Sequence, residues 1–141
     1  MSELPRAEVT LTVPFFDADM LGIVWHGHYA KYFEIARCAL LETIDYDYLT
    51  MKATGYVWPV VDLHVRYLTP ARFGQTLRVT ARMLEYEYRL KLAYEIHDPE
   101  GQRLAKGTTV QVAVAVDSGE MCFGSPPVLL ERIERWRRQR T

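Results

Sequence analysis

The amino-acid sequence predicts an α+β fold in which one long helix packs on an antiparallel sheet of about five strands. Two observations carry this prediction. Residues 29–43 are apolar around most of a helical circumference, so other parts of the chain must surround this helix. From residue 57 onward, apolar residues recur at every second position, which is typical of antiparallel strands with one buried face.

The predicted elements follow one another along the chain. Residues 8–13 alternate between apolar and polar side chains and are expected to form the first strand, ahead of the helix. Residues 45–55 break the helical pattern and are interpreted as a loop or a short helix. Four further strands, separated by turn residues, are expected at 61–68, 77–83, 88–97 and 110–116. Pro126 and Pro127, followed by spaced apolar residues, predict a short amphipathic C-terminal helix.

Three uncharged residues lie on the second face of the last predicted strand: Gln111, Ala113 and Ala115. This face is unusually uncharged for a surface in water, so we interpret it as a contact between subunits. His64 and His97 fall on polar strand faces and are expected to be solvated.

Length and composition limit the class of protein. A chain of 141 residues is expected to form a single domain over residues 1–141, and 49% hydrophobic with 25% charged residues is typical of a globular protein. The net charge of −1 gives no reason to expect nucleic acid as a partner. No apolar run approaches the ~20 residues of a membrane span. Cys38 and Cys122 form neither a disulfide framework nor a metal-ligand pair, which favours a cytoplasmic location.

Residues 15–37 concentrate the side chains that can do chemistry. Two carboxylates, Asp17 and Asp19, are followed by His26 and His28 at the point where the helix is expected to begin. The first amide N–H groups of a helix lack acceptors within the helix and can therefore polarise a carbonyl oxygen. A carboxylate beside such donors indicates a site for acyl chemistry.

Other kinds of site fit these residues less well. The two histidines and two aspartates could bind a metal, but we expect none because no third and fourth ligand follow at a zinc-site spacing. The three serines lack a Gly-x-Ser-x-Gly context, and Cys38 is expected to be a packed thiol within the helix. No glycine-rich phosphate-binding pattern is present, so no nucleotide cofactor is expected.

An ordered set of residues in this segment also carries a resemblance to a known family: Asp17, Asp19, Gly22, Ile23, Val24, His26, Tyr29, Phe33, Glu34, Ala36 and Arg37. The set resembles the signature of the hotdog-fold acyl-CoA thioesterases, specifically the 4-hydroxybenzoyl-CoA thioesterase family and its relatives associated with the Tol-Pal system. Residues 60–72 resemble the second strand and following turn of the same family. Ala18 stands where many members have Thr or Cys, and Met20 and Leu21 are bulkier than usual.

The resemblance implies a hotdog fold, in which the sheet wraps around the long central helix, and hydrolysis of a small acyl-CoA to free acid and CoA without a cofactor. It implies that Asp19 is the catalytic carboxylate. It also implies that His26 lies at the helix start, where its backbone N–H faces the thioester carbonyl. Asp17, Gly22 and Tyr29 are expected to support this site, by ordering the loop, permitting its turn and packing one helical turn later.

The resemblance also implies that basic residues at about the position of Arg89 and Lys91 meet the phosphates of CoA; the alternative for both residues is a solvated strand face. Members of the family act as dimers or dimer-based tetramers with sites between subunits. Whether Asp19 attacks the thioester directly or activates water stays open, as does the acyl group, aromatic or short aliphatic. A hotdog dehydratase is a second interpretation, although a His-Phe-Pro-type motif is absent. A non-catalytic acyl-CoA-binding module is a third.

Overall fold

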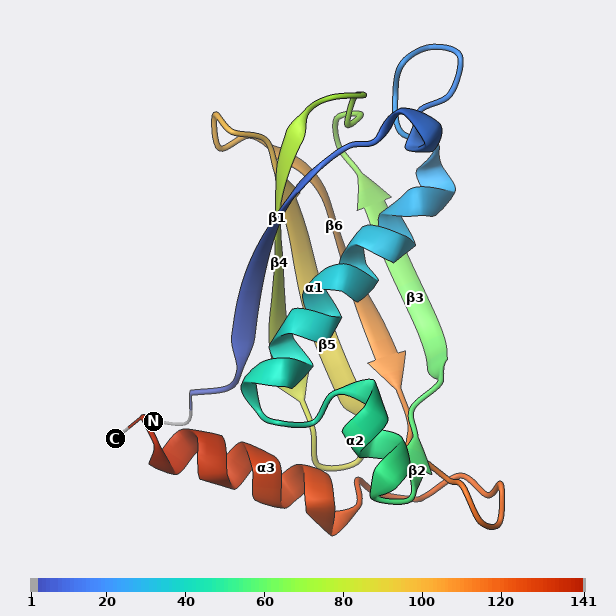
Figure 1. Cartoon of the computed structure of the whole chain (residues 1–141), viewed down its shortest axis with the longest axis vertical. Helices are drawn as coiled ribbons and strands as arrows, with labels where there is room; N and C mark the ends of the chain where they lie inside the picture. Colours follow the sequence, from blue (N-terminus) through green and yellow to red (C-terminus); the bar gives the residue numbers. More distant parts are fainter. Residues whose placement is uncertain (1–2, 141) are drawn as a thin grey trace.

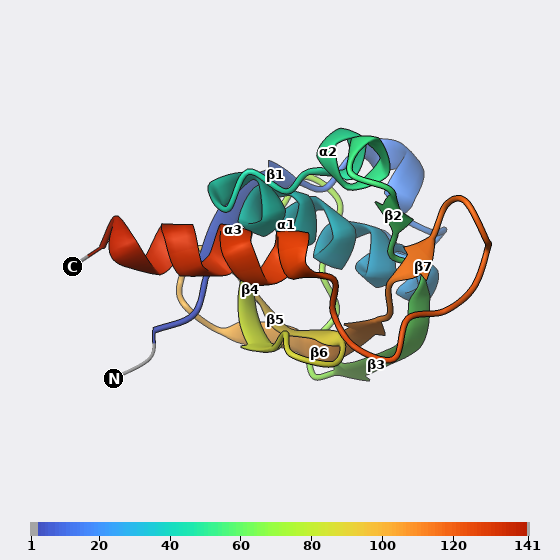
Figure 2. The same cartoon turned by 90° about the horizontal axis from the view of Figure 1, so that it is seen from below.

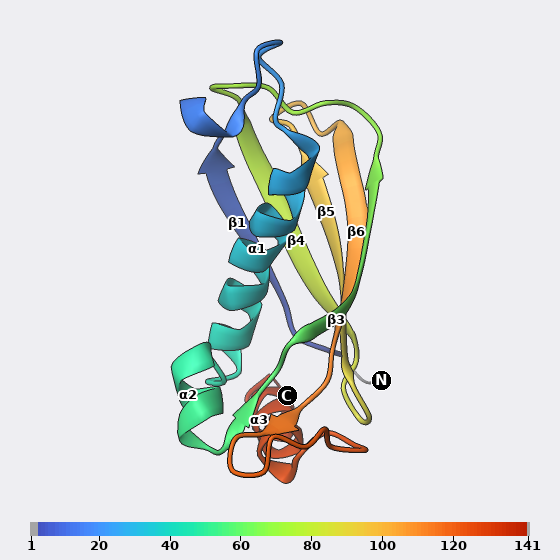
Figure 3. The ribbon, with the colours of Figure 1, turned by 90° about the vertical axis from the view of Figure 1, so that its right-hand side faces the viewer.

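The computed structural model describes residues 3–140, and its main feature is a five-stranded antiparallel sheet. In spatial order its strands are β1 (Arg6–Thr12), β4 (Thr76–Glu85), β5 (Leu90–His97), β6 (Arg103–Gln111) and β3 (Val60–Tyr67). The long helix α1 (Tyr29–Thr43) lies across one face of this sheet (Figure 1). Viewed from the side, helix and sheet form two layers (Figure 3). The predicted fold class is therefore confirmed.

The smaller elements close the two ends of this arrangement. They are the 3-10 turns η1 (Phe15–Asp17) and η2 (His26–His28), the short helix α2 (Tyr48–Ala53), the paired strands β2 (Tyr56–Val57) and β7 (Val114–Ala115), and the C-terminal helix α3 (Pro127–Arg138). Helix α3 crosses one end of the molecule (Figures 1 and 2), and η2 lies at the opposite end (Figure 1). Among residues 3–140, no helix combines the length and apolar character needed to span a membrane.

The core lies between α1 and the inner face of the sheet. The alternating apolar residues of β4 and β5 are fully buried there, as their pattern predicts: Leu77, Val79, Ala81, Leu90, Leu92 and Ile96. The Phe33 ring of α1 stacks on the Tyr94 ring of β5 with centroids 4.5 Å apart. Helix and sheet approach so closely that a Cβ atom at Gly107 would overlap the Phe33 ring and the carbonyl oxygen of His64.

The position of the last long strand was predicted wrongly. The sequence pattern placed it at residues 110–116, whereas β6 covers Arg103–Gln111 and pairs with both β5 and β3. The valine alternation continues past the sheet, and Val114–Ala115 pairs with Tyr56–Val57 instead. Periodicity alone does not show which neighbouring strands a segment will meet, and those neighbours decide where β6 begins and ends.

The uncharged residues assigned to a subunit contact also have a different environment. Gln111 and Ala113 are 1% and 2% exposed within the chain, and the Gln111 side-chain amide donates to the carbonyl oxygen of Trp58 (2.7 Å). Their lack of charge therefore reflects burial inside one chain. His64 is exposed as predicted, but His97 is half-buried beside Glu95, with 3.4 Å between His97 Nε2 and the Glu95 carboxylate.

The edge strand β3 departs from the expectation of a buried apolar face. Val61, Leu63 and Tyr67 are 58%, 45% and 48% exposed. They lie at the end of the sheet with β6 as their one neighbouring strand among the described residues. The long edge of β3 therefore presents unpaired backbone groups together with apolar side chains.

Candidate active site

A small hairpin precedes the helix and carries both carboxylates. Ala18 and Val24 form a bridge across it, and the backbone N–H of Asp19 donates to the carbonyl oxygen of Ile23 (2.8 Å). The hairpin turns at Gly22, whose φ of 78° lies in the left-handed region that favours glycine. Nothing crowds the space where a Cβ of Gly22 would lie, so its conformation rather than a lack of room calls for glycine.

Asp19 lies at the turn of this hairpin and is exposed. Its Oδ1 accepts the backbone N–H of Leu21 (2.8 Å), which orients the carboxylate. Because the group is accessible, it can approach a bound substrate or a water molecule.

Asp17, only two residues earlier, has the opposite environment. Its side chain is 1% exposed, and Lys31 Nζ donates to both of its oxygens (2.7 and 2.8 Å). The Tyr32 hydroxyl donates to Oδ2 (2.7 Å), and His28 Nε2 lies 3.8 Å from Oδ1. Asp17 thus joins the hairpin to the first turn of α1.

The charges around Asp17 determine its protonation. Burial pushes the pKa of its carboxyl upward, but hydrogen bonds from Lys31 and Tyr32, with the positive charge of Lys31, bring the pKa below its usual value. Burial raises the pKa of the Tyr32 hydroxyl well above its usual value, and the hydrogen bond to the Asp17 carboxylate raises this pKa further. The carboxylate is therefore ionised and the phenol protonated near neutral pH.

The helix start is held by two tyrosines. The Tyr67 hydroxyl of β3 donates to the carbonyl oxygen of His26 (2.8 Å), and the rings of Tyr67 and Tyr29 meet edge to face at 4.9 Å. Tyr29 is buried, and its hydroxyl accepts the backbone N–H of Ala71 (3.0 Å). These contacts connect η2 to β3 and to the segment that follows it.

Asp19 and His26 line one pocket of about 250 Å³ at the start of α1. Its other lining residues are mostly apolar or aromatic: Ile23, Val24, Trp25, Tyr29, Tyr67, Leu68, Thr69 and Pro70. The structure therefore brings together the two residues expected to be catalytic and the expected supporting residue Tyr29. A carboxylate, the turn that leads into α1 and an apolar wall around one small pocket suit an acyl group and its carbonyl.

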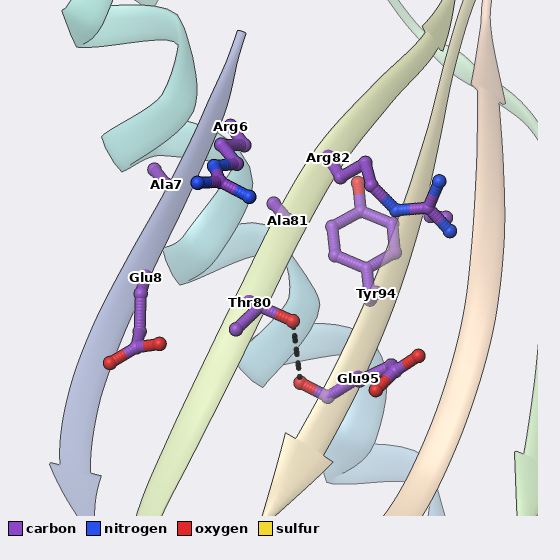
Figure 4. A pocket seen from close by; sticks show the side chains of 9 residues that line it. Arg6, Ala7, Glu8, Thr80, Ala81, Arg82, Tyr94 and Glu95 are labelled. Atoms are coloured by element: carbon purple, nitrogen blue, oxygen red, sulfur yellow. Dashed lines mark hydrogen bonds between the residues drawn. The ribbon is translucent and has the colours of Figure 1, made fainter.

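A larger hollow of about 540 Å³ lies elsewhere, on the outer face of the sheet. Figure 4 shows Arg6 and Glu8 of β1, Thr80 and Arg82 of β4, and Glu95 of β5 around it. None of its lining residues belongs to the hairpin or to α1. Its size alone therefore does not connect it with the carboxylate and helix start.

Arg89 and Lys91 are not brought to the pocket within one chain. Across the sheet, Leu90, which lies between them in the chain, is aligned with Gln111 and Val60, at one end of β3. The pocket residue Tyr67, at the other end of β3, is aligned with Ile96. Six residues of strand separate the two levels, or about 20 Å. The exposed Arg89 also forms an ion pair with Glu85, with 3.1 Å between Nη2 and Oε2.

Sequence reasoning gave Lys31 and Tyr67 no role in the site and did not place Tyr32 beside Asp17. Lys31 falls among the few polar positions of the predicted helix and Tyr32 among its apolar positions, while Tyr67 fits the alternation of a predicted strand. The one available signal was the position of Lys31 and Tyr32 in the first helical turn, next to the segment with two carboxylates.

Over residues 3–140, no group of three or more His, Cys, Asp or Glu residues is arranged to hold a metal ion.

Comparison with known proteins places this geometry in a family. The profile of the Thioesterase-like superfamily matches residues 13–135. The Bacillus subtilis protein YneP, whose name carries a provisional assignment as an acyl-CoA thioesterase, is 29% identical over 109 residues, covering 77% of this chain and 79% of YneP. The 1,4-dihydroxy-2-naphthoyl-CoA hydrolase of Thermosynechococcus vestitus is 26% identical over 111 residues, covering 77% and 76% of the two chains.

The fold of this chain is also similar to that of a solved thioesterase structure. The crystal structure of a DHNA-CoA thioesterase from Staphylococcus aureus superposes with a TM-score of 0.82 at 24% identity, covering 92% of this chain and 89% of that one. The likeness of fold and the family match, which extends over most of the chain, lead to one conclusion: this protein belongs to the Thioesterase-like superfamily and is a thioester hydrolase.

Proposed function

We propose that this protein hydrolyses the thioester of a small acyl-CoA, with Asp19 as the reacting carboxylate and the backbone amide of His26, in the 3-10 turn that leads into α1, as a donor to the carbonyl oxygen. The observation that carries the proposal is the pocket lined by both Asp19 and His26. Asp17 is an unsuitable reacting group because it is buried and both of its oxygens accept hydrogen bonds. The family match favours hydrolysis over the dehydratase and binding-module interpretations.

The chemistry needs few groups. In the first route, an Asp19 oxygen attacks the thioester carbon, CoA leaves as a thiolate, and water hydrolyses the resulting anhydride. In the second, Asp19 takes a proton from a water molecule that attacks the carbon, and the thiolate leaves from the tetrahedral intermediate. In both routes negative charge develops on the carbonyl oxygen, where helix-start N–H donors stabilise it. A thiolate leaves readily, so neither route needs a strong general acid.

The proposal includes a homodimer formed through β3. Antiparallel pairing of two β3 edges about a two-fold axis would cover the exposed side chains of Val61 and Leu63 and satisfy the unpaired edge. It would also set the Val60 end of one β3 beside the Tyr67 end of the other. Arg89 and Lys91 lie at the Val60 level, so Arg89 of the partner subunit would approach the pocket that its own chain does not reach.

The acyl group is the finer part of the proposal. The hydrolase from Thermosynechococcus vestitus is named for a bicyclic aromatic acyl group, and the aromatic side chains of Trp25, Tyr29 and Tyr67 line the pocket here. An aromatic acyl-CoA is therefore the first substrate class to test, with short aliphatic acyl-CoAs as the second. We also propose that the protein belongs to the narrower 4-hydroxybenzoyl-CoA thioesterase branch, that it is associated with the Tol-Pal system, and that it is located in the cytoplasm.

The decisive experiment compares wild type with Asp19→Asn on a panel of acyl-CoAs, following released CoA with a thiol reagent. The substitution keeps the shape of the side chain but removes its charge. We expect kcat to fall about a thousandfold or more, on the order of 4 kcal/mol of transition-state stabilisation, with substrate binding retained.

Asp47→Asn is the matched control. Asp47 is also exposed, and its Oδ1 accepts a backbone N–H, that of Thr50 (2.9 Å), but it lies at the start of α2. Its variant should keep wild-type turnover. Near-normal turnover by Asp19→Asn would remove Asp19 from the mechanism, and a wild-type protein that releases no CoA from any member of the panel would contradict the proposed function.

A further inference from the structure

One partly buried ion pair joins two parts of the site that come from different segments. The reacting carboxylate proposed above lies on the hairpin, whereas the proposed amide donor lies in η2, which leads directly into α1. Asp17 belongs to the hairpin, and Lys31 and Tyr32, which hold its carboxylate, belong to α1.

The two arms of the hairpin are attached in different ways. The second arm is fastened by backbone bonds to the segment after β3: the N–H of Val24 donates to the carbonyl oxygen of Ala71 (2.8 Å), and the N–H of Phe73 donates to that of Gly22 (3.0 Å). The first arm carries Asp19. Its side-chain attachment to the helix is the Asp17 carboxylate, two residues before Asp19.

We propose that Lys31 and Tyr32 are positioning residues for thioester hydrolysis, which hold the first arm of the hairpin so that Asp19 faces the carbonyl carbon bound at the helix start. This inference rests on the function proposed above. Without Lys31, a buried carboxylate would lose its counter-charge, and a charge in that environment is unfavourable. Asp17 would then move toward water, and the arm with Asp19 would move with it.

The size of the effect follows from the geometry of the reaction. Attack requires the reacting atoms to lie within a few tenths of an ångström of a productive arrangement, and a displacement of about 1 Å can lower the rate about a hundredfold. The loss should appear in kcat, because the apolar pocket wall and the CoA contacts remain. A residue that only stabilises the fold would lower the melting temperature and leave the kcat of the folded enzyme unchanged.

The first test removes single hydroxyl groups. Tyr32→Phe deletes the donor to Asp17 and keeps the ring, while Tyr46→Phe deletes another buried hydroxyl, which accepts the indole N–H of Trp58 (2.9 Å) far from the pocket. We expect Tyr32→Phe to lower kcat at least tenfold with little change in KM, and Tyr46→Phe to keep wild-type kcat even if both lose the same thermal stability. Equal kcat values for the two variants would overturn the role of Tyr32.

The second test uses Lys31, whose side chain is 44% exposed and therefore accessible to a small amine. Lys31→Ala should lose about a hundredfold in kcat, Lys31→Arg should retain most of it, and propylammonium should restore activity to Lys31→Ala in a saturable manner. The double variant Asp17→Asn/Lys31→Ala should show no such rescue, because the carboxylate that would bind the amine is gone.

The outcomes separate this inference from the proposed function. A folded Lys31→Ala variant with wild-type kcat would refute the positioning role while leaving the hydrolase intact, and so would a low kcat that neither arginine nor propylammonium restores. Absence of hydrolysis by the wild type would instead refute the proposed function.

Discussion

Asp17 and Asp19 are separated by one residue, yet their environments give them different chemistry. Asp17 is buried against a lysine and a tyrosine hydroxyl, and Asp19 is exposed on a turn. The first arrangement fixes a charge in place, whereas the second leaves a charge accessible to substrate. A pair of identical side chains can therefore divide into a structural anchor and a reacting group because one faces the helix and the other faces the pocket.

The lowered pKa of Asp17 predicts how stability depends on pH. A carboxyl whose pKa is lower in the folded protein than in the unfolded chain stabilises the fold above its unfolded value, near 4, and this contribution disappears as the pH falls through the folded value. Urea unfolding from pH 7 to pH 2 should therefore show a loss of stability below about pH 4 that is smaller in Asp17→Asn.

The stability of Asp17→Asn at pH 7 gives a second test of the same ion pair. Asp17→Asn should be less stable than wild type there, since a neutral amide cannot pair with Lys31. Asp117→Asn, at an exposed turn, should keep both the stability and the pH dependence of wild type. Parallel pH curves for wild type and Asp17→Asn would show that Asp17 is not the group responsible.

Arg89 predicts a second residue-scale effect. If its guanidinium meets a CoA phosphate, Arg89→Ala should raise KM several-fold with little change in kcat, because the lost contact is the same in ground state and transition state. Added salt should weaken substrate binding in the same direction. The control is Arg78→Ala, which removes a cation of β4 that lies 4.0 Å from the Glu8 carboxylate of β1. An unchanged KM in Arg89→Ala would indicate a purely solvated side chain.

At the scale of elements, the hairpin of residues 17–25 depends on a backbone conformation that glycine adopts without cost. Gly22→Ala forces a side chain into the left-handed region, so we expect a loss of about 1 kcal/mol in the free energy of unfolding, together with a lower kcat because the turn carries Asp19.

Chemical denaturation and initial rates measure the two effects. Gly124→Ala is the control, because its Cβ would lie at ordinary contact distances, 3.6 Å from the Glu87 carbonyl oxygen and 3.8 Å from the Tyr88 ring. If Gly22→Ala were as stable and as active as Gly124→Ala, the turn would not be strained by a side chain.

Helix α1 also contains a charge that its sequence pattern concealed. Arg37 falls among the few polar positions of this helix but is only 5% exposed, with its Nε donating to the Tyr48 hydroxyl (3.0 Å) and its Nη1 to the Tyr94 hydroxyl (3.3 Å). It therefore ties α1 to both α2 and β5. The hydroxyl groups that make its burial possible lie 11 and 57 residues away, so a helical stripe could not reveal them.

At the scale of the whole molecule, the open edge of β3 predicts assembly. Leu63→Lys places a charge in the middle of the proposed dimer contact and should convert a dimer to monomers, since a buried unpaired charge opposes association. Activity should fall with dimerisation if Arg89 of the partner subunit serves each site. Sedimentation analysis at micromolar concentration, combined with rates on the same samples, measures both.

Leu130→Lys is the matched control, because Leu130 is also partly exposed, at 37%, but lies on α3. It should leave the oligomer intact. A wild-type protein that is monomeric and fully active at micromolar concentration would contradict the assembly and the shared site together.

Local patterns in the sequence determined the fold class, the long buried helix and the neighbourhood of the site. Alternation and turn residues specify strands within a few positions, and Asp19 precedes His26 by only seven residues, so the chain itself keeps the carboxylate near the helix start. The tertiary structure decided the contacts between distant segments. Lys31 reaches Asp17 across 14 residues and Tyr67 reaches His26 across 41, and the pairing of β6 with β5 and β3 set its true bounds. Such contacts depend on strand register and helix packing, which only the assembled core defines.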